Sequence, residues 1–254
     1  METILKIENI EKYYGNKANI TKAIDNISFS VEKGEYVAIM GASGSGKTTL
    51  LNCISTIDRV SSGHIYVGRD DITKLRGNQL NRFRREELGF IFQDFNLLDN
   101  FTIEDNIRLP LVLAGEDYKT MHAKVQPLAK QLGLEQLLNK YPYEVSGGQK
   151  QRAAVARALI TNPRILLADE PTGALDSKAA TNLLRQLREI NKTGQTILMV
   201  THSNVAASYA DRVMFIKDGE VFHQIYRGDM TRSAMLDKIC DAVTVLMRGG
   251  EDSE

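Results

Sequence analysis

The sequence has little cysteine and no excess of one charge. Its two cysteines, Cys53 and Cys240, are too few for a disulfide framework, so each is expected to be a small buried hydrophobe in a reducing cytoplasm. Lysine and arginine together number 32, as do aspartate and glutamate, which excludes a global basic field that would attract nucleic acid. No nucleic-acid partner is therefore expected.

Long apolar runs are also missing. No stretch approaches the roughly 20 apolar residues that a membrane-spanning helix requires, and the longest runs, such as Ile165 to Ala168, are short. Residues 1–10 alternate charged and apolar side chains and lack the apolar core of a signal peptide. Any role at a membrane is therefore expected to depend on a partner protein.

Short apolar strands alternate with helical stretches along the chain. Strands are predicted within residues 1–40 and at 65–67, 165–168 and 196–200, with a hairpin over 212–224. Helices are predicted at about 47–55 and 178–191, and the Leu- and Ala-rich stretch from about 94 to 160 predicts a helical subdomain inserted into the core. This alternation indicates a mostly parallel sheet that binds ligands at the carboxyl ends of its strands.

The segment Gly41-Ala-Ser-Gly-Ser-Gly46-Lys47-Thr48 matches the phosphate-loop pattern, with a strand before it and a helix after it. Its backbone N–H groups can converge on phosphate oxygens, Lys47 is expected to reach the outer phosphates, and the Thr48 hydroxyl is expected to bind Mg²⁺. The alternative, a chance glycine-rich turn, is disfavoured by the flanking strand and helix. The predicted nucleotide contacts are Gly41, Ser43, Gly44, Ser45, Gly46, Lys47, Thr48 and Thr49.

Two carboxylates end the apolar strand that begins at Ile165. Asp169 is expected to hold the Mg²⁺ shell, and Glu170 is expected to polarise a water molecule for in-line attack on the γ-phosphate. The alternative is a pair of acids that only caps the next helix. The presence of a phosphate loop in the same chain argues against that alternative.

A second candidate anion-binding helix start is the segment Ser146-Gly147-Gly148-Gln149, which precedes a helical stretch. Ser146 is a suitable N-cap, and the glycines allow close approach of the backbone. One nucleotide has one γ-phosphate, which the first loop already holds. This segment therefore folds onto the same nucleotide, serves a neighbouring chain, or is a plain helix cap.

Together with Gly173-Ala-Leu-Asp176 and Thr201-His202, these segments resemble an ABC-transporter nucleotide-binding domain over nearly the whole chain. The resemblance implies an α/β fold: a phosphate-loop NTPase core with an N-terminal antiparallel β subdomain and an inserted α-helical subdomain. The nucleotide-binding domain would span residues 1–228, followed by a C-terminal helix and acidic tail over 229–254. The implied activity is hydrolysis of ATP with Mg²⁺ in a homodimer, in which Ser146–Gln149 completes the partner chain's site.

The resemblance also implies roles for single residues. Gln93 would touch Mg²⁺ and the attacking water and sense the transmembrane partner, and His202 would contact the γ-phosphate. Tyr14 would stack on adenine, and Asp176 would link the two sites across the dimer. Each has an alternative: Gln93 as an ordinary loop amide, His202 as a strand-end histidine satisfied by its neighbours, and Tyr13 in place of Tyr14.

Longer segments resemble a narrower group. Residues 81–98 resemble the subfamily that serves macrolide exporters, lipoprotein-release complexes and the cell-division pair, and residues 40–52, 141–152 and 205–219 resemble the bacitracin-efflux type of peptide-resistance ATPase of Gram-positive bacteria. That type works with one large permease, often together with a sensor histidine kinase. The implied function is the ATPase of such a permease, peripheral to the cytoplasmic face of the plasma membrane.

This resemblance is also compatible with other functions. The chain would alternatively be the ATPase of a lipoprotein-release or cell-division complex, or a regulator that signals through a permease-like partner and moves no substrate. A third alternative, a soluble ABC protein acting on DNA or ribosomes, usually needs a coiled-coil insertion, tandem ATP sites or zinc cysteines, which this sequence lacks. The transported substrate is not encoded here, because it is selected by the permease.

Three further features have local interpretations. Val145 and Ser203 stand where relatives often have Leu and Asp, and Ser203 removes a charge next to His202. The arginines Arg82, Arg84 and Arg85 are expected to form a solvated face.

The C-terminal segment predicts an amphipathic helix over residues 231–248 that ends at Gly249-Gly250 and precedes a mobile acidic tail, 251–254. Its apolar stripe either packs on its own domain or contacts the second subunit or the permease. The residues of this stripe are Met235, Leu236, Ile239, Cys240, Val243, Leu246 and Met247.

Overall fold

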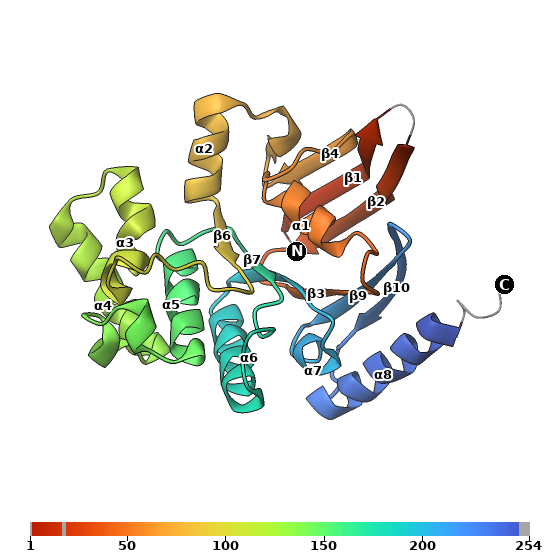
Figure 1. Ribbon diagram of the computed structural model, residues 1–254. Coiled ribbons are helices and arrows are strands. Elements are labelled where there is room, and N and C mark those ends of the chain that lie inside the picture. Colours follow the sequence, from red (N-terminus) through yellow and green to blue (C-terminus); the bar gives the residue numbers. More distant parts are fainter. Residues whose placement is uncertain (1, 17–18, 249–254) are drawn as a thin grey trace. The chain divides into compact units, whose positions relative to one another are not determined.

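The structure, a computed structural model shown in Figure 1, describes residues 2–16 and 19–248. The chain divides into two compact units. Unit 1 comprises residues 1–74 and 197–254, and unit 2 comprises residues 75–196. The predicted helix stop at 249–250 and the acidic tail lie outside the described residues. In the part of the chain that the structure describes, no helix is both long and apolar enough to cross a membrane.

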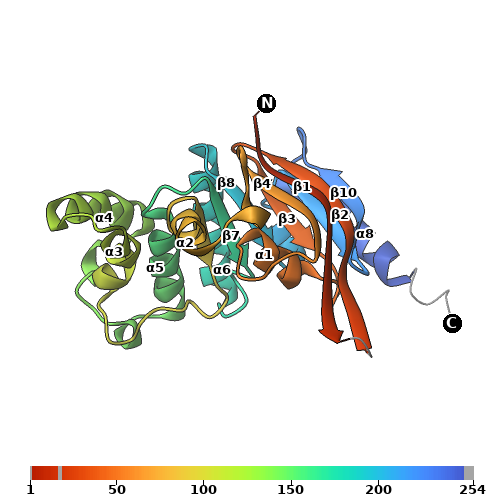
Figure 2. The ribbon, with the colours of Figure 1, turned by 90° about the horizontal axis from the view of Figure 1, so that it is seen from above.

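The first sheet of unit 1 is antiparallel, with the strand order β2-β1-β4-β5. Its long strands β1 (Thr3–Asn16) and β2 (Asn19–Glu32) run side by side, as Figure 2 shows, and β4 (Ser62–Val67) and β5 (Asp70–Asp71) extend the sheet. The period of two is clear in β2, where Ile27, Phe29 and Val31 are buried between exposed serines. One face of this sheet therefore covers the core of unit 1.

A second set of strands in unit 1 has the order β10-β9-β3-β8. Strand β3 (Tyr36–Met40) is parallel to β8 (Thr196–Val200) and β9 (Arg212–Lys217), and β9 forms the predicted hairpin with β10 (Glu220–Tyr226). All residues of β3 and β8 are buried, as is usual for parallel strands covered on both faces. The carboxyl ends of β3 and β8 lead into the phosphate loop and into the Thr201-His202 segment, respectively.

The helices of unit 1 each follow one of these strands. Helix α1 (Lys47–Ile54) follows β3 and its loop, the short helix η1 (Ile72–Lys74) follows β5, and α7 (Asn204–Ala207) follows β8. Helix α8 (Arg232–Arg248) follows β10 and lies where the sequence predicted an amphipathic helix.

Unit 2 contains two parallel strands, β6 (Leu88–Ile91) and β7 (Ile165–Asp169). The segment between them holds the helices α3 (Ile103–Ala114), α4 (Tyr118–Leu132) and α5 (Gly147–Leu159), with the short turns η2 (Glu135–Leu137) and η3 (Pro142–Glu144). Helix α5 packs against α3, α4, β6 and α6 (Ser177–Lys192), so it is the centre of this unit. The three helices lie within the stretch where the sequence predicted a helical subdomain.

Helix α2 (Gly77–Glu86) was not predicted, and it carries the three arginines. Arg82 donates to Glu86 at 2.8 Å and Arg84 is exposed, but the Arg85 side chain is only 31% exposed. The expectation of a solvated arginine face therefore holds for Arg82 and Arg84 and only in part for Arg85, which is half-buried. Only Phe83 is buried in this helix, and Leu80 and Phe83 are its only apolar residues, which are too few to predict a helix from their spacing alone.

Candidate functional site

Two backbone contacts require glycine at the ends of the phosphate loop. A Cβ atom on Gly41 would lie 2.2 Å from the Ile216 carbonyl oxygen in β9, and one on Gly46 would lie 2.3 Å from the Ala23 carbonyl oxygen in β2. Gly46 also has a positive φ of 99°, which an L side chain rarely adopts. The loop is thus fitted closely between two strands of unit 1, and helix α1 begins directly after it.

Lys47, the first residue of α1, is buried and turns back across the loop. Its Nζ donates to the Ala42 carbonyl at 2.7 Å and to the Ser45 hydroxyl at 3.3 Å. The ammonium group is therefore held beside the backbone N–H groups that the sequence predicts to bind phosphate. The next side chain, Thr48, is exposed and presents its hydroxyl at the start of the helix.

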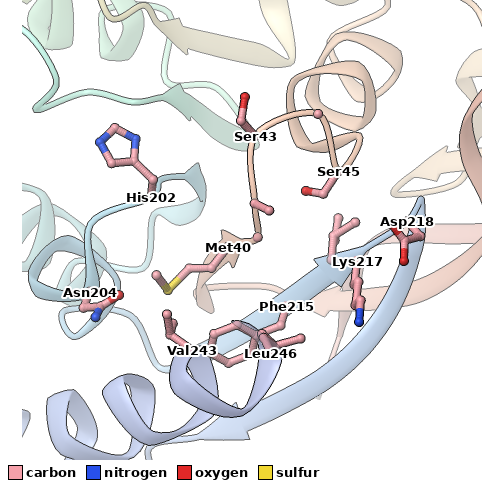
Figure 3. A pocket seen from close by; sticks show the side chains of 14 residues that line it. Met40, Ser43, Ser45, His202, Asn204, Phe215, Lys217, Asp218, Val243 and Leu246 are labelled. Atoms are coloured by element: carbon pink, nitrogen blue, oxygen red, sulfur yellow. The ribbon is translucent and has the colours of Figure 1, made fainter. Parts of the chain in front are cut away.

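Residues of the phosphate loop and His202 line one pocket of about 570 Å³ within unit 1. Figure 3 shows His202 and Ser43 on one side of this pocket and Val243 and Leu246 of α8 on the opposite side. The Thr201 N–H donates to the Ile39 carbonyl at 3.0 Å, which continues the β3–β8 pairing up to the histidine. His202 is thereby brought beside residues 41–45 of the loop.

Ser203, which stands where relatives often have Asp, has a local structural role that the sequence did not predict. Its hydroxyl accepts a hydrogen bond from the Ala206 N–H at 3.2 Å and is the N-cap of α7. Serine therefore keeps the capping function of an aspartate without placing a charge next to His202.

The apolar stripe of α8 packs on its own unit. Met235 and Ile239 are fully buried, α8 contacts α7, and Val243 and Leu246 form a wall of the pocket beside the phosphate loop. This supports the intramolecular interpretation of the stripe; the Met247 side chain lies outside the described part. Cys240, however, is exposed, so the expectation that both cysteines are buried is wrong for this one and holds only for Cys53.

Cys240 lies at the edge of the α8 stripe, not at its centre. Its Sγ accepts a hydrogen bond from the Asn204 side chain at 3.4 Å, so the thiol meets a polar neighbour at the surface. Burial raises the pKa of the other thiol, Cys53, to about 12, which keeps it protonated.

Tyr14 is connected to the phosphate-loop helix, and its neighbour Tyr13 has a different environment. The Tyr14 hydroxyl donates to Asp58 at 2.7 Å, and burial first and this hydrogen bond second raise the pKa of Tyr14, whereas a hydrogen bond with Thr49 of α1 opposes the rise. The ring of Tyr13 instead lies 5.6 Å from the ammonium of Lys22. Tyr14 and Tyr13 thus have different partners, and the adenine-stacking role of Tyr14 stays a prediction.

The two predicted acids of unit 2 lie at the end of β7. Four buried residues, 165–168, precede Asp169, and both Asp169 and Glu170 are half-buried. Glu170 has a left-handed backbone with φ of 45°, which is uncommon for a residue other than glycine and is concentrated at functional sites. The two carboxylates are thus adjacent at the carboxyl end of β7, where the sequence predicts them.

Gln151 organises the loops around Gln93 and was not singled out from the sequence. It is fully buried on α5, and its side-chain amide donates to the carbonyls of Phe92 at 3.1 Å and Pro171 at 2.7 Å. It therefore joins the loop that carries Gln93 to the loop that follows Glu170. The one signal in the sequence is a polar residue on the buried, alanine-rich face of a helix.

Arg157, also on α5, holds the same loop from its other end. Its guanidinium donates to the carbonyls of Phe95, at 2.9 Å, and Asn96. Both of these residues have a left-handed backbone, with φ of 61° and 49°. Such conformations persist when the surroundings fix them, so α5 fixes the conformation of the loop after Gln93.

The two polar segments at the starts of α5 and α6 are helix caps that lie next to each other. The Ser146 hydroxyl accepts from the Gln149 N–H at 3.4 Å, and the Gln149 side chain accepts from the Ser146 N–H at 2.8 Å. Asp176 accepts from two backbone N–H groups of α6, each at 3.0 Å. A Cβ atom on Gly148 would lie 3.0 Å from that of Ala179, so the two helix starts approach closely.

The predicted Mg²⁺ donors are chemically suitable. Thr48, Gln93 and Asp169 offer hydroxyl, amide and carboxylate oxygens, which a hard cation prefers. Among the described residues no group of three His, Cys, Asp or Glu side chains could form a protein cage for a metal. Mg²⁺ is usually held by one or two side chains together with substrate phosphates and water, so it does not need such a cage.

The predicted site residues fall into two sets. Unit 1 contains Tyr14, the phosphate loop and His202, whereas unit 2 contains Gln93, Ser146–Gln149, Asp169, Glu170 and Asp176. Within unit 1 the loop and His202 share a pocket, and within unit 2 Gln93 lies against the loop that precedes Asp176. Each unit thus contains its own set of the predicted site residues.

The chain is similar to known ATP-binding proteins over almost its whole length. A family model described as ABC transporter matches residues 24–173. The chain is 50% identical to the ABC transporter ATP-binding protein YxdL of Bacillus subtilis, with 99% of this chain and 98% of that protein covered. It is also 50% identical to the bacitracin export ATP-binding protein BceA of Halalkalibacterium halodurans, over 96% of each. The macrolide export ATP-binding/permease protein MacB of Mannheimia succiniciproducens is 43% identical, and the match covers 86% of this chain but 34% of that protein.

Solved structures support the fold. The chain is 37% identical to the dimeric ATP-binding cassette MJ0796 in a post-hydrolysis state bound to ADP and Pi. The match has a TM-score of 0.80 and covers 87% of this chain and 98% of that one. A structure of cbiO1 from Clostridium perfringens, part of an ABC transporter complex, matches with 30% identity and a TM-score of 0.79 over 88% of each chain. These likenesses confirm the α/β phosphate-loop NTPase fold that the sequence predicts.

Proposed function

Because this chain belongs to the ABC transporter family, as an ATP-binding subunit that hydrolyses ATP, we propose that it powers a membrane permease that confers resistance to peptides of the bacitracin type. The observation that carries the proposal is the 50% identity to the bacitracin export protein BceA over 96% of both chains. Likeness at this level and over this length supports a shared permease type as well as a shared ATPase domain.

In this proposal the nucleotide is held by unit 1. The N–H groups of residues 41–48 and the Lys47 ammonium bind the phosphates of ATP, and Tyr14 stacks on adenine. The Thr48 hydroxyl, Asp169 and Gln93 hold Mg²⁺, which supplies positive charge that stabilises the phosphate oxygens when it is bound. The close fit of Gly41 and Gly46 between neighbouring strands supports this assignment, because it fixes the loop before the nucleotide binds.

Glu170 and His202 carry the hydrolysis step. The Glu170 carboxylate accepts a proton from the attacking water, whose oxygen forms a bond to the γ-phosphorus while the bond to the β-phosphate oxygen breaks, giving ADP and phosphate. His202 donates a hydrogen bond to the γ-phosphate, and Gln93 orients the water. The left-handed backbone at Glu170 supports a functional role for this residue.

Two copies of the chain form the active unit. Ser146–Gln149 of one copy completes the nucleotide site of the other, and Asp176 connects the two sites. Both Ser146 and Asp176 are exposed at the capped starts of adjacent helices, where further backbone N–H groups favour an anion. The solved cassette MJ0796, described as dimeric, provides a second line of support.

The permease docks on a groove of about 610 Å³ in unit 2. Its lining combines apolar side chains from β6 and α3 with cations, and Leu113, at 66% exposure, is an apolar side chain left open to solvent. Phe92 and Asn96, which flank Gln93 in sequence, also line this groove, so a partner bound there would contact the loop that carries Gln93. A sensor histidine kinase would act through the same permease.

The test combines purification and function. A tagged chain is purified from membranes of its own organism, and the membrane protein that accompanies it is identified. Both genes are then expressed in a bacitracin-sensitive Gram-positive host, with the Glu170→Gln variant as the matched control. We expect a large permease in the complex and higher bacitracin tolerance for the wild-type pair alone. Equal tolerance in all strains would reject the peptide-resistance role, and a kinase response without tolerance would favour the signalling alternative.

A further inference from the structure

The exposed ring of Tyr14 is fixed at its hydroxyl end. Its side chain is on β1 with the residue 42% exposed, and its hydroxyl donates to Oδ2 of Asp58 at 2.7 Å. An exposed aromatic ring usually samples several rotamers, and a hydrogen bond to a carboxylate removes that freedom. The ring is therefore ordered before any nucleotide is present.

Lys12 binds the other oxygen of the same carboxylate. Its Nζ donates to Oδ1 of Asp58 at 2.6 Å and to the Arg59 carbonyl at 2.7 Å, and the lysine is only 9% exposed. The same ammonium lies 4.8 Å from the centroid of the Tyr14 ring, within the range of a cation–π contact. One face of the ring thus meets a cation, and a stacked base would take the opposite face.

Asp58 is itself held by helix α1. The Asp58 N–H donates to the Asn52 carbonyl at 3.1 Å, and the Thr56 N–H donates to the Cys53 carbonyl at 3.2 Å. Thr56 has a φ of 61°, an outlier for a β-branched residue that persists only when its surroundings fix it. The carboxylate is therefore placed rigidly relative to the helix that begins at the phosphate loop.

The charges of this cluster agree with a permanent network. Burial acts to raise the pKa of Asp58, but hydrogen bonds from Lys12, Tyr14 and the Arg59 backbone outweigh it and lower the pKa. The pKa of Tyr14 is raised, mainly by burial and by Asp58. Near neutral pH the carboxylate is thus ionised and the tyrosine is protonated, which the hydrogen bond between them requires.

We propose that Lys12 and Asp58 are positioning residues that hold the Tyr14 ring for the base of the nucleotide and thereby set the KM for ATP without acting on its phosphates. This inference rests on the proposed role of Tyr14 in adenine binding. It separates base recognition from phosphate binding, although both depend on residues attached to α1.

The first test is Asp58→Asn, which keeps the shape of the side chain. Binding of Mg-ATP and of Mg-tripolyphosphate, which has no base, is measured by calorimetry together with ATPase kinetics. We expect ATP affinity to fall and KM to rise by about 3- to 10-fold, the effect of one charge-assisted hydrogen bond, with tripolyphosphate affinity and kcat within about 2-fold of wild type. An equal loss for both ligands would overturn the proposal, because Asp58 would then only support the phosphate loop.

The second test is a double-mutant cycle. Tyr14→Phe removes the hydroxyl alone and should weaken ATP binding to a similar extent, and adding Asp58→Asn to it should cost less than about a further 2-fold. If the fold-losses in ATP affinity of the two single variants multiplied in the double variant, Asp58 would act independently of the Tyr14 hydroxyl. Tyr13→Phe, one residue away, is the matched control and should leave both affinities unchanged. Thermal melting of every variant identifies any that fails to fold.

A third variant separates this proposal from the proposed role of Tyr14. The chain contains no tryptophan, so Tyr14→Trp introduces a single indole reporter. Quenching of its fluorescence by ATP and not by tripolyphosphate would place the base at position 14. If no quenching occurs, the adenine-binding role of Tyr14 is wrong and the inference falls with it. If quenching occurs but Asp58→Asn leaves ATP affinity unchanged, only the positioning role is wrong.

Discussion

The Gln93 side chain lies directly against Gly173. A Cβ atom at position 173 would come within 3.1 Å of both Cδ and Nε2 of Gln93, which is tighter than most contacts of a real Cβ atom. Gly173 begins the segment that ends at Asp176, the N-cap of α6. The glycine therefore leaves room for the Gln93 amide beside the start of α6.

The variant Gly173→Ala should move Gln93 by a few tenths of an ångström. If Gln93 orients the attacking water, kcat should fall by about 3- to 10-fold with little change in KM, because small misplacements of a reacting group are costly. Steady-state ATPase kinetics measure both constants, and a melting curve controls for folding. An unchanged kcat in a well-folded variant would argue against an orienting role for Gln93.

Glu170→Gln tests the general base. The amide keeps the size of the side chain but does not accept the proton, so ATP hydrolysis should fall by about 100- to 10,000-fold. ATP binding should survive, and size-exclusion chromatography should show an ATP-bound dimer that accumulates. Hydrolysis within a few-fold of wild type would reject this role for Glu170.

The dimer is tested with two variants that damage different halves of the site. Lys47→Ala should weaken nucleotide binding to its own chain, since it removes a buried cation from the loop, while its Ser146 segment stays intact. Ser146→Arg should leave the loop intact but block the segment that serves the partner. A mixture rebuilds one complete site of two, so ATP-dependent dimerisation should be stronger in the mixture than in either variant. Equal dimerisation in all three samples would show that Ser146 serves its own chain.

The stripe of α8 is tested by a buried and an exposed position on the same helix. Ile239 is fully buried, so Ile239→Ala should lower the free energy of unfolding by about 2–4 kcal/mol. Val245 is 63% exposed, and Val245→Ala should change the free energy of unfolding by less than about 0.5 kcal/mol. Urea denaturation measures both. Truncation after Gly228 should likewise destabilise the chain, and a normally stable truncated chain with impaired permease assembly would favour the interface alternative.

Asp71 predicts a pH dependence of stability. Burial acts to raise its pKa, but hydrogen bonds from Lys74, Thr73 and His64 outweigh burial and lower the pKa from 3.8 to about 2. The contribution of Asp71 to the free energy of unfolding is therefore fully present above about pH 4 and is lost as the pH falls towards 2. The Lys74 side chain is 71% exposed, so solvent screening reduces the contribution to about 1 kcal/mol.

The variant Asp71→Asn should be less stable than wild type by about this amount at pH 7, and the difference should shrink as the pH falls from 4 to 2. Chemical denaturation at several pH values measures it. Asp70→Asn, at the exposed neighbouring position, is the control and should change stability by less than about 0.5 kcal/mol at every pH. A difference that grows on acidification would contradict the sign of the pKa shift.

The elements with strong periodicity could be predicted from the sequence. The strands β3, β7 and β8 are short apolar runs, and α6 buries Leu183, Leu184, Leu187 and Ile190 on one face, as its spacing indicated. The phosphate loop was recognisable because its residues are adjacent in the chain and bind through the backbone. Helix α2, with Phe83 as its single buried residue, lacks any such pattern, and the short apolar run of strand β6 was not recognised as a strand.

The contacts that organise the site could not be predicted, because they join residues that are distant in sequence. Asp58 is 44 residues from Tyr14, and Gln151 is 59 residues from Phe92, so no local spacing indicates either hydrogen bond. The sequence likewise could not show that Glu170 has a left-handed backbone. These features depend on how strands and loops approach each other in the folded chain, which local propensity does not encode.

The length of helix α1 sets the distance between the phosphate contacts and the base contact of the nucleotide. Its eight residues rise about 12 Å from the phosphate loop to the turn that presents Asp58 and, through it, the Tyr14 ring. Adding or removing one residue would rotate the far end by about 100° and shift it by about 1.5 Å, so phosphate and base contacts could no longer be satisfied together. The size of the ligand therefore constrains the length of α1, in addition to the identities of Lys47 and Thr48 at its start.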